Sequence, residues 1–228
     1  MAAYDLEEQE QLAEIKAWWK QYGNRLVNTA LAVAVAVVAW QGWNWYQRDQ
    51  AGQASAIYGA LQRAAQEGNT QQIKAASGEL LEKFGRTPYA VLGALTSAKA
   101  MIEAGDAQTA KAQLLWAAEH GKDELRDLAR LRAAAALLDE KAYGQALAQL
   151  DGAASGPAFE IRFQDARGDI LAAQGKRTEA VSAYRTALSR LDELEKGGKS
   201  GGGEWQSQSN AIFRELVGQK IDALGGGL

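Results

Sequence analysis

The chain has 228 residues, 47% of them hydrophobic, and a formal net charge of −3 at pH 7. It contains no cysteine, which excludes disulfide bonds and thiolate metal sites. Residues 1–25 hold five acidic and three basic side chains, a net charge of −2, so the rest of the chain carries only −1. Because neither part has a surplus of basic residues, we expect no nucleic-acid partner.

Residues 1–25 form a first segment, in which residues 5–22 have the spacing of a short amphipathic helix. Its apolar side chains recur every three or four residues: Leu12, Ile15, Trp19 and Tyr22. Such a helix would lie against lipid headgroups or a partner's cytoplasmic loops, or it would only anchor the chain beside the membrane. Gly23 and Asn24 would permit a bend after it.

Residues 26–47 lie between Arg25 and Arg48, carry no charge, and are predicted to form a transmembrane helix. A helix rises about 1.5 Å per residue, so residues 26–45 cover about 30 Å, the hydrocarbon thickness of a lipid bilayer. Aromatic residues flank the run on both sides, as expected for rings at the two headgroup levels. The predicted membrane-interface anchors are Trp18, Trp19, Tyr22, Trp40, Trp43, Trp45 and Tyr46.

Other interpretations of this apolar run stay open. It could be a buried helix of a soluble domain, or a strand, since Val33, Val35 and Val37 alternate with alanine. It could also be a cleaved secretory signal that ends near Ala39. However, the acidic residues 1–25 are unlike the short basic start of a secretory signal, so we favour an uncleaved anchor.

Basic residues near the two ends of the run predict its orientation. Lys16, Lys20 and Arg25 precede it, whereas Arg48 and Arg63 follow it. Basic flanks tend to stay in the cytoplasm. The excess of three against two therefore favours a cytoplasmic segment at residues 1–25 and a domain outside the cytoplasm at residues 48–228.

From residue 51 onward the apolar residues recur at helical spacing, with short turns between the segments. Residues 51–67 and 70–84 predict a first helix hairpin. Later turns at residues 104–107, 140–143 and 174–177 each precede an alanine, and these alanines are 36 and 34 residues apart. This spacing is typical of tetratricopeptide-type (TPR) repeats, whose stacked hairpins form a solenoid. We predict an all-α fold with about four hairpins; an irregular helical bundle would share much of the pattern.

Within these hairpins, small residues recur where paired helices would approach closely, and larger ones where they would fill the groove between repeats. The predicted packing positions are Ala98, Ala110, Leu114, Ala134, Ala146, Leu150, Gly168, Ala180 and Tyr184. Three further alanines continue the pattern farther along the second helix of each pair: Ala117, Ala153 and Ala187.

The last part of the chain predicts a flexible loop at residues 196–203 and then a helix at residues 204–224 that caps the solenoid. The apolar residues available for capping are Trp205, Ile212, Phe213, Leu216, Val217 and Ile221. Residues 225–227, all glycine, form a tail with no structural signal.

Residues that carry enzyme chemistry are scarce. His120, the single histidine, stands before Gly121 at a predicted helix end, where a basic side chain is favourable. Carboxylate pairs such as Glu79 and Glu82 have ordinary helix-surface spacing, and no nucleotide-binding glycine motif occurs. We therefore expect no catalytic residues, no metal site, no cofactor and no enzyme activity.

Four segments carry a resemblance to one family: EIKAWWKQYG (residues 14–23), GWNWYQ (42–47), ARGDILAAQGKRTEAVSAY (166–184) and QKIDAL (219–224). Together they resemble the YfgM-type ancillary subunits of the bacterial SecYEG translocon. The resemblance implies a single-pass inner-membrane protein with a periplasmic TPR-like domain. It also implies association with SecYEG and with a PpiD-like periplasmic prolyl-isomerase chaperone, in support of newly translocated client proteins. The glycine-rich residues 197–203 depart from the family's usual pattern.

Two functional hypotheses follow. The first is a membrane-tethered interaction module whose groove, lined by the first helix of each pair, holds a chaperone or an emerging chain beside the channel. The second is a structural scaffold for envelope biogenesis, or a membrane-anchored regulator whose domain faces the cytoplasm. A topology reporter after Leu228 would separate a periplasmic module from a cytoplasmic regulator.

Overall fold

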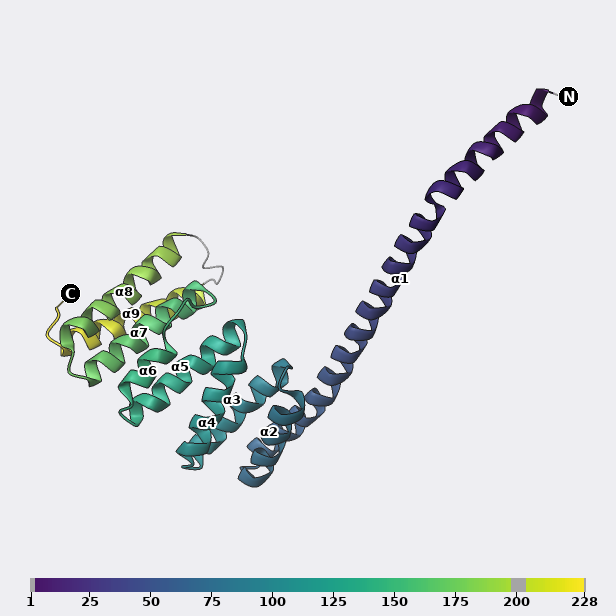
Figure 1. Ribbon diagram of the computed structural model, residues 1–228. Coiled ribbons are helices and arrows are strands. Elements are labelled where there is room, and N and C mark those ends of the chain that lie inside the picture. Colours follow the sequence, from purple (N-terminus) through teal and green to yellow (C-terminus); the bar gives the residue numbers. More distant parts are fainter. Residues whose placement is uncertain (1–2, 198–203, 228) are drawn as a thin grey trace. The chain divides into compact units, whose positions relative to one another are not determined.

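The protein is described by a computed structural model that covers residues 3–197 and 204–227. Over those residues the chain forms α-helices joined by short turns and contains no strand, as predicted (Figure 1). The helices are α1 (Ala3–Gln66), α2 (Thr70–Phe84), α3 (Pro88–Glu103), α4 (Ala107–His120), α5 (Asp123–Asp139), α6 (Tyr143–Gln149), α7 (Pro157–Ala173), α8 (Arg177–Lys196) and α9 (Glu204–Ala223).

The chain divides into two compact units, Met1–Gly52 and Gln53–Leu228, and α1 contributes to both. In the first unit, Gly23 and Asn24 do not interrupt the helix. The indole of Trp19 covers Gly23, where an added Cβ would lie 3.1 Å from the ring. The glycine therefore makes room for an aromatic ring one turn earlier. Val33, Val35 and Val37 are also helical, so the strand interpretation is wrong.

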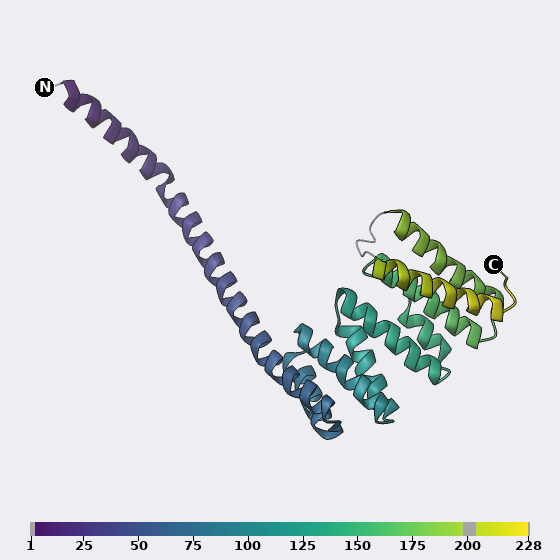
Figure 2. The same ribbon diagram turned by 180° about the vertical axis from the view of Figure 1, so that it is seen from behind.

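The second unit consists of four helix hairpins and a capping helix, which confirms the predicted architecture. The end of α1 pairs with α2, and the other pairs are α3 with α4, α5 with α6, and α7 with α8 (Figure 1). Seen from behind, α9 lies against the last pair (Figure 2). The proline of Thr87-Pro88 begins α3 and that of Gly156-Pro157 begins α7, since proline fits the first turn of a helix.

All four hairpins turn in the same way. One residue in each turn has a positive φ: Gly68 (68°), Gly105 (78°), Lys141 (59°) and Gly175 (78°). The next residue donates its N–H to a carbonyl five residues earlier, as in a Schellman motif. These bonds run from Asn69 to Ala64, Asp106 to Met101, Ala142 to Leu137 and Lys176 to Leu171, at 2.8–2.9 Å. The repeats therefore share a turn geometry, and Lys141 is the one non-glycine residue among the four positive-φ positions.

The nine predicted packing positions all lie in the interior of the second unit. Ala98, Ala110, Leu114, Ala134, Ala146, Leu150, Ala180 and Tyr184 are at most 2% exposed, and Gly168 is buried. The tightest approach is between α7 and α8: a Cβ on Gly168 would stand 2.8 Å from Cζ of Tyr184 and closer still to Cδ1 and Cε1. Only glycine fits there without displacing the ring.

The third hairpin is shorter than the repeat pattern predicts. The helix α6 has 7 residues, and Ala153, expected in that helix, is an exposed loop residue. Charged side chains hold this loop. Arg130 donates to the carbonyls of Gln149 (2.6 Å) and Asp151, and Asp127 accepts the N–H of Ser155 at 2.5 Å. Because these groups satisfy the backbone outside a helix, the chain leaves the helix early.

Asp127 is fully buried in this arrangement. Burial opposes its charge, but the hydrogen bonds from Ser155 and the nearby Arg126 and Arg130 outweigh that effect, so the pKa of Asp127 falls below its ordinary value. The carboxylate is therefore charged at neutral pH and ties the α6–α7 loop to α5.

The capping helix α9 buries one stripe, made of Phe213, Val217 and Ile221. Ile212 and Leu216, which are also among the apolar residues of this helix, are outside the stripe and more than half exposed. They precede Phe213 and Val217 by one residue, a rotation of about 100° around the helix axis. The side chain of Trp205 and residues 198–203 of the expected loop lie outside the described part.

Polar contacts add to the cap. The Nζ of Lys220 on α9 lies 2.7 Å from carboxylate oxygens of both Asp165 and Asp169 on α7. Burial opposes the Lys220 charge, but these two carboxylates raise its pKa above the ordinary value. The glycine tail, which has no structural signal in the sequence, also contacts α8: Arg185 donates to the carbonyls of Gly226 and Gly227 at 2.9 and 3.0 Å.

Candidate functional site

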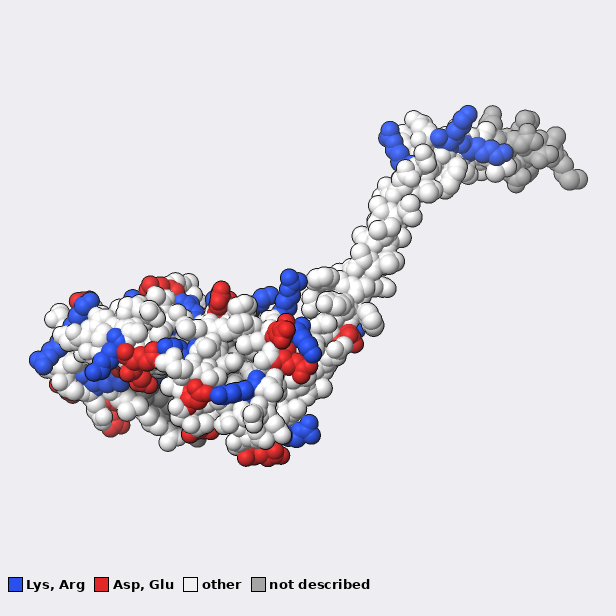
Figure 3. All heavy atoms as spheres, turned by 60° about the horizontal axis from the view of Figure 1, so that its bottom comes forward, with Lys and Arg blue, Asp and Glu red and all other residues white. Residues whose placement is uncertain are grey.

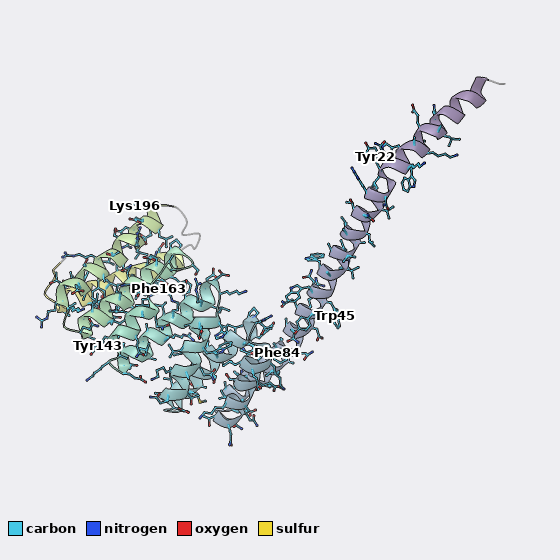
Figure 4. All side chains as sticks on the ribbon, viewed as in Figure 1. Tyr22, Trp45, Phe84, Tyr143, Phe163 and Lys196 are labelled. Carbon is cyan, nitrogen blue, oxygen red and sulfur yellow. The ribbon has the colours of Figure 1, made fainter. Side chains whose placement is uncertain are left out.

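The predicted membrane anchors all project from α1 into the surroundings. Trp18, Trp19, Tyr22, Trp40, Trp43, Trp45 and Tyr46 are each at least 40% exposed. Figure 4 shows Tyr22 and Trp45 extending from the helix, and 23 residues separate them, about 34 Å along a helix. Two pairs of rings touch at the ends of the run, Trp18 with Tyr22 (5.8 Å) and Trp43 with Tyr46 (6.2 Å between centroids).

Between these aromatic groups, α1 exposes a continuous apolar surface. Figure 3 shows this stretch of the first unit without charged side chains, with basic side chains toward its N-terminal end. Within the described residues, this is the one helix long and apolar enough to cross a membrane, and none of its apolar window is buried against the rest of the chain. So large an apolar surface needs a cover other than water, and lipid supplies one.

The second unit carries a groove between α3 and α5, the first helices of two successive hairpins. The groove has a volume of about 670 Å³. Its lining residues are Leu95, Lys99, Ile102, Glu103, Gly105, Ala107, Ala110, Leu114, Arg132, Ala135, Ala136, Asp139 and Glu140. The sequence predicted a partner-binding groove lined by the first helix of each pair; this groove is lined by two such helices and also by residues of α4, among them the predicted packing positions Ala110 and Leu114.

Ile102, near the end of α3, gives the groove an apolar side chain that faces solvent. It is 57% exposed, whereas the neighbouring Leu95 is only 4% exposed. The small side chains of Ala135 and Ala136 line the opposite wall and leave the space open. An exposed aliphatic side chain beside a concave, alanine-lined surface is typical of a site for a partner's apolar side chain.

Ion pairs between successive hairpins hold the shape of the solenoid. Lys74 on α2 reaches Asp106 at the start of α4, and Lys111 on α4 reaches Glu140 at the end of α5, both at 2.6 Å. The hydrogen bond from Lys74, with those from Thr109, lowers the pKa of Asp106 to about 2. Asp106 thus stays charged and links two hairpins near the groove.

The single histidine, His120, is held by its neighbours on α4. Its ring stacks on Trp116 with 4.3 Å between centroids, and its Nδ1 lies 3.0 Å from the Trp116 carbonyl. Over residues 3–197 and 204–227, no group of three or more His, Asp or Glu side chains is placed to hold a metal ion.

A second open cavity, of about 740 Å³, lies beside α8 and the C-terminal tail. Arg177, Arg185 and Arg190 line it, and Arg190 pairs with Glu193 at 2.9 Å. The sequence had given no sign of it, because α8 and the tail meet only after the chain has folded back.

These features define the class of the protein: a TPR-like helical-hairpin protein with an exposed apolar helix at its N-terminal end. Residues 16–226 match the tetratricopeptide repeat-like domain family. The chain is 30% identical over 201 residues to the ancillary SecYEG translocon subunit of Haemophilus influenzae, covering 85% of this chain and 95% of that protein. Identity to the subunit of the same name is 29% in Neisseria gonorrhoeae, over 98% of this chain and 100% of the relative. Identity to the Escherichia coli subunit of that name is 28%, over 79% of this chain and 87% of the relative.

The chain therefore belongs to the family of ancillary SecYEG translocon subunits. The resemblance carried by the anchor and repeat segments is confirmed, and so is the TPR-like fold.

Proposed function

We propose that the chain is a non-catalytic ancillary subunit of a bacterial Sec translocon, fixed in the inner membrane by one pass through residues 26–47. The observation that carries this proposal is the match over nearly the whole length to relatives named as such subunits. The match covers both the apolar helix and the hairpins, so the tether and the interaction surface come together. In this proposal the apolar helix and the hairpins act by binding lipid and partner proteins, not by catalysis.

In this proposal the tether concentrates the hairpin domain beside the channel. Two proteins held in one membrane meet at a high effective concentration, so a weak contact suffices. The α3–α5 groove then holds either a PpiD-like periplasmic prolyl-isomerase chaperone or an emerging apolar segment of a translocated client. The exposed Ile102 supports this role, because a bound partner would remove its apolar side chain from water, which favours binding.

The proposed topology puts residues 1–25 in the cytoplasm and residues 48–228 in the periplasm. Lys16, Lys20 and Arg25 before the span favour that orientation. A reporter fused after Leu228 tests it: alkaline phosphatase should be active and green fluorescent protein dark. The opposite result would favour the alternative function, a membrane-anchored scaffold or regulator whose domain faces the cytoplasm.

Purification from detergent-solubilised membranes tests the translocon assignment. The tagged full chain should retain SecYEG subunits, and a variant whose residues 26–47 are replaced by an unrelated apolar helix serves as the control for the span. A photo-crosslinking residue at position 102 should capture a chaperone or client, while the same residue at the exposed Ala112 of α4 should not. Purification without any translocon subunit would refute the assignment.

A further inference from the structure

We infer that the α3–α5 groove recognises an amphipathic helix that carries one acidic and one basic residue, about two turns apart, on either side of an apolar centre. This inference names the partner's chemistry and rests on the proposed function of the groove as a docking site. It follows from the unequal charge of the two ends of the groove.

The two walls of the groove run in the same direction. The α3 helix ends at Glu103, and α4 begins four residues later at Ala107. Gln108 and Lys111, in the first turns of α4, reach Glu140 at the end of α5, at 3.4 and 2.6 Å. The C-terminal ends of α3 and α5 therefore lie at the same end of the groove.

Because the walls are parallel, their charges separate along the groove. On each wall the basic residue precedes the acidic one: Lys99 is four residues before Glu103 on α3, and Arg132 is seven residues before Asp139 on α5. The last carbonyls of α3 and α5 add partial negative charge at the end where Glu103 and Asp139 lie. The groove is thus more acidic toward that end and more basic toward the other, and the apolar Ile102, Ala135 and Ala136 fall between these charges in the sequence.

The charges at both ends are available to a partner. In the described part of the chain, Arg132 and Asp139 form no ion pair with each other or with another residue, whereas Lys111 neutralises Glu140. Lys99 and Glu103 do pair, but at 3.8 Å and with side chains 73% and 66% exposed, a geometry that contributes little. Two opposite charges facing one groove are suited to hold a partner of complementary charge.

The spacing of the charges on α5 is one that a helical partner can match residue for residue. Arg132 and Asp139 are seven residues apart on one helix, about 10 Å, and a partner helix brings two of its own charges to that distance with the same spacing. On the partner helix, the residues three or four positions after the first charged residue lie on the same face as the two charges. An aliphatic side chain there would meet Ile102 and the open space beside Ala135 and Ala136.

Three fluorescent helical peptides would test this inference on the full chain in lipid nanodiscs. All carry a central leucine pair and charges seven residues apart: one Glu and one Lys, two Glu, or two Lys. The wild-type groove should bind the mixed peptide about three- to tenfold more tightly than either of the others, and the preference should shrink at high salt.

Charge reversals at the groove should change the ranking in a defined way. Asp139→Lys makes both ends basic, so the two-Glu peptide should bind best, whereas Arg132→Glu should favour the two-Lys peptide. Arg86→Glu and Glu119→Lys change the same charges at exposed positions outside the groove and should preserve the wild-type order. Ile102→Ser should weaken the binding of all three peptides.

An unchanged ranking in the Asp139 and Arg132 variants would overturn the inference, and so would no binding of any peptide. Circular dichroism of each variant ensures that a lost preference does not reflect unfolding. Translocon copurification is measured on the same variants. Retained SecYEG with no peptide preference would refute only the groove chemistry, whereas wild-type chain without SecYEG would refute the proposed function.

Discussion

At the scale of single residues, the solenoid depends on a few positions where only a small side chain fits. Gly168 is the clearest, because the ring of Tyr184 occupies the volume of its missing Cβ. The Tyr184 hydroxyl also donates to Asp169 at 2.7 Å, which limits how far the ring can move aside. Glycine in a helix costs conformational entropy, and here close packing between α7 and α8 compensates for that cost.

Gly168→Ala should therefore lower the free energy of unfolding by about 1–3 kcal/mol, since the new methyl group displaces a buried ring. Gly78→Ala in α2 is the matched control, because nothing lies within 4 Å of its added Cβ. That change should raise the stability by about 0.5–1 kcal/mol through helix propensity alone. Urea titration of the full chain in detergent would measure both, and equal effects at the two sites would contradict the packing argument.

Lys141 is the counterpart of three turn glycines and holds a φ of 59°. A side chain in this region costs about 1 kcal/mol or more relative to glycine. We expect Lys141→Gly to raise the stability by about 1 kcal/mol, because it relieves that strain at an exposed position. Lys141→Ala, which removes the amine but keeps Cβ, should give no comparable gain in the same thermal unfolding experiment.

At the scale of elements, the hairpins are joined by ion pairs that reach from one repeat to the next. Asp106 serves twice, as the N-cap of α4 through the Thr109 N–H and as the partner of Lys74 on α2. Because its pKa is lowered to about 2, its charge stabilises the fold fully above the ordinary carboxyl pKa of about 4.

The stabilisation that the Asp106 charge gives to the fold should disappear as the pH falls from about 4 to 2. Over this range the folded state takes up the proton that the unfolded state already binds. Asp106→Asn keeps a capping side chain and removes the charge. The melting temperature of the variant should lie below that of the wild type at pH 6 and approach it near pH 2. A difference that stays constant over this range would show that the charge is unimportant.

The elements also show where sequence periodicity succeeds and fails. The turns at Gly68, Gly105 and Gly175 were predictable because glycine and helical spacing are local signals. The early end of α6 was not predictable, because the loop after it is bound by Asp127 and Arg130, which belong to α5. Helical spacing predicted a groove lined by the first helices of the hairpins but not that Arg132 and Asp139 line it, because one helix's period does not say which faces of separate hairpins meet.

At the scale of the whole molecule, the proposed function requires residues 26–47 to lie in a bilayer. The exposed surface of this part of α1 has Val33, Val35 and Val38 among its apolar side chains, and each is more than half exposed. Without lipid such a surface would drive aggregation rather than function. The membrane assignment is therefore the premise from which the effective concentration of the hairpin domain follows.

Ala34→Lys tests that premise, because it places a charge near the middle of the predicted span. A lysine there costs about 2.5–3.5 kcal/mol of insertion free energy, whereas Gln47→Lys adds the same charge beside Arg48, where the amine reaches the headgroups. After carbonate washing, the wild type and Gln47→Lys should stay with the membranes, and a part of Ala34→Lys should be released or degraded. Equal retention of all three would indicate that the apolar helix is covered by protein instead of lipid, and the tether would then have to be sought in a partner subunit.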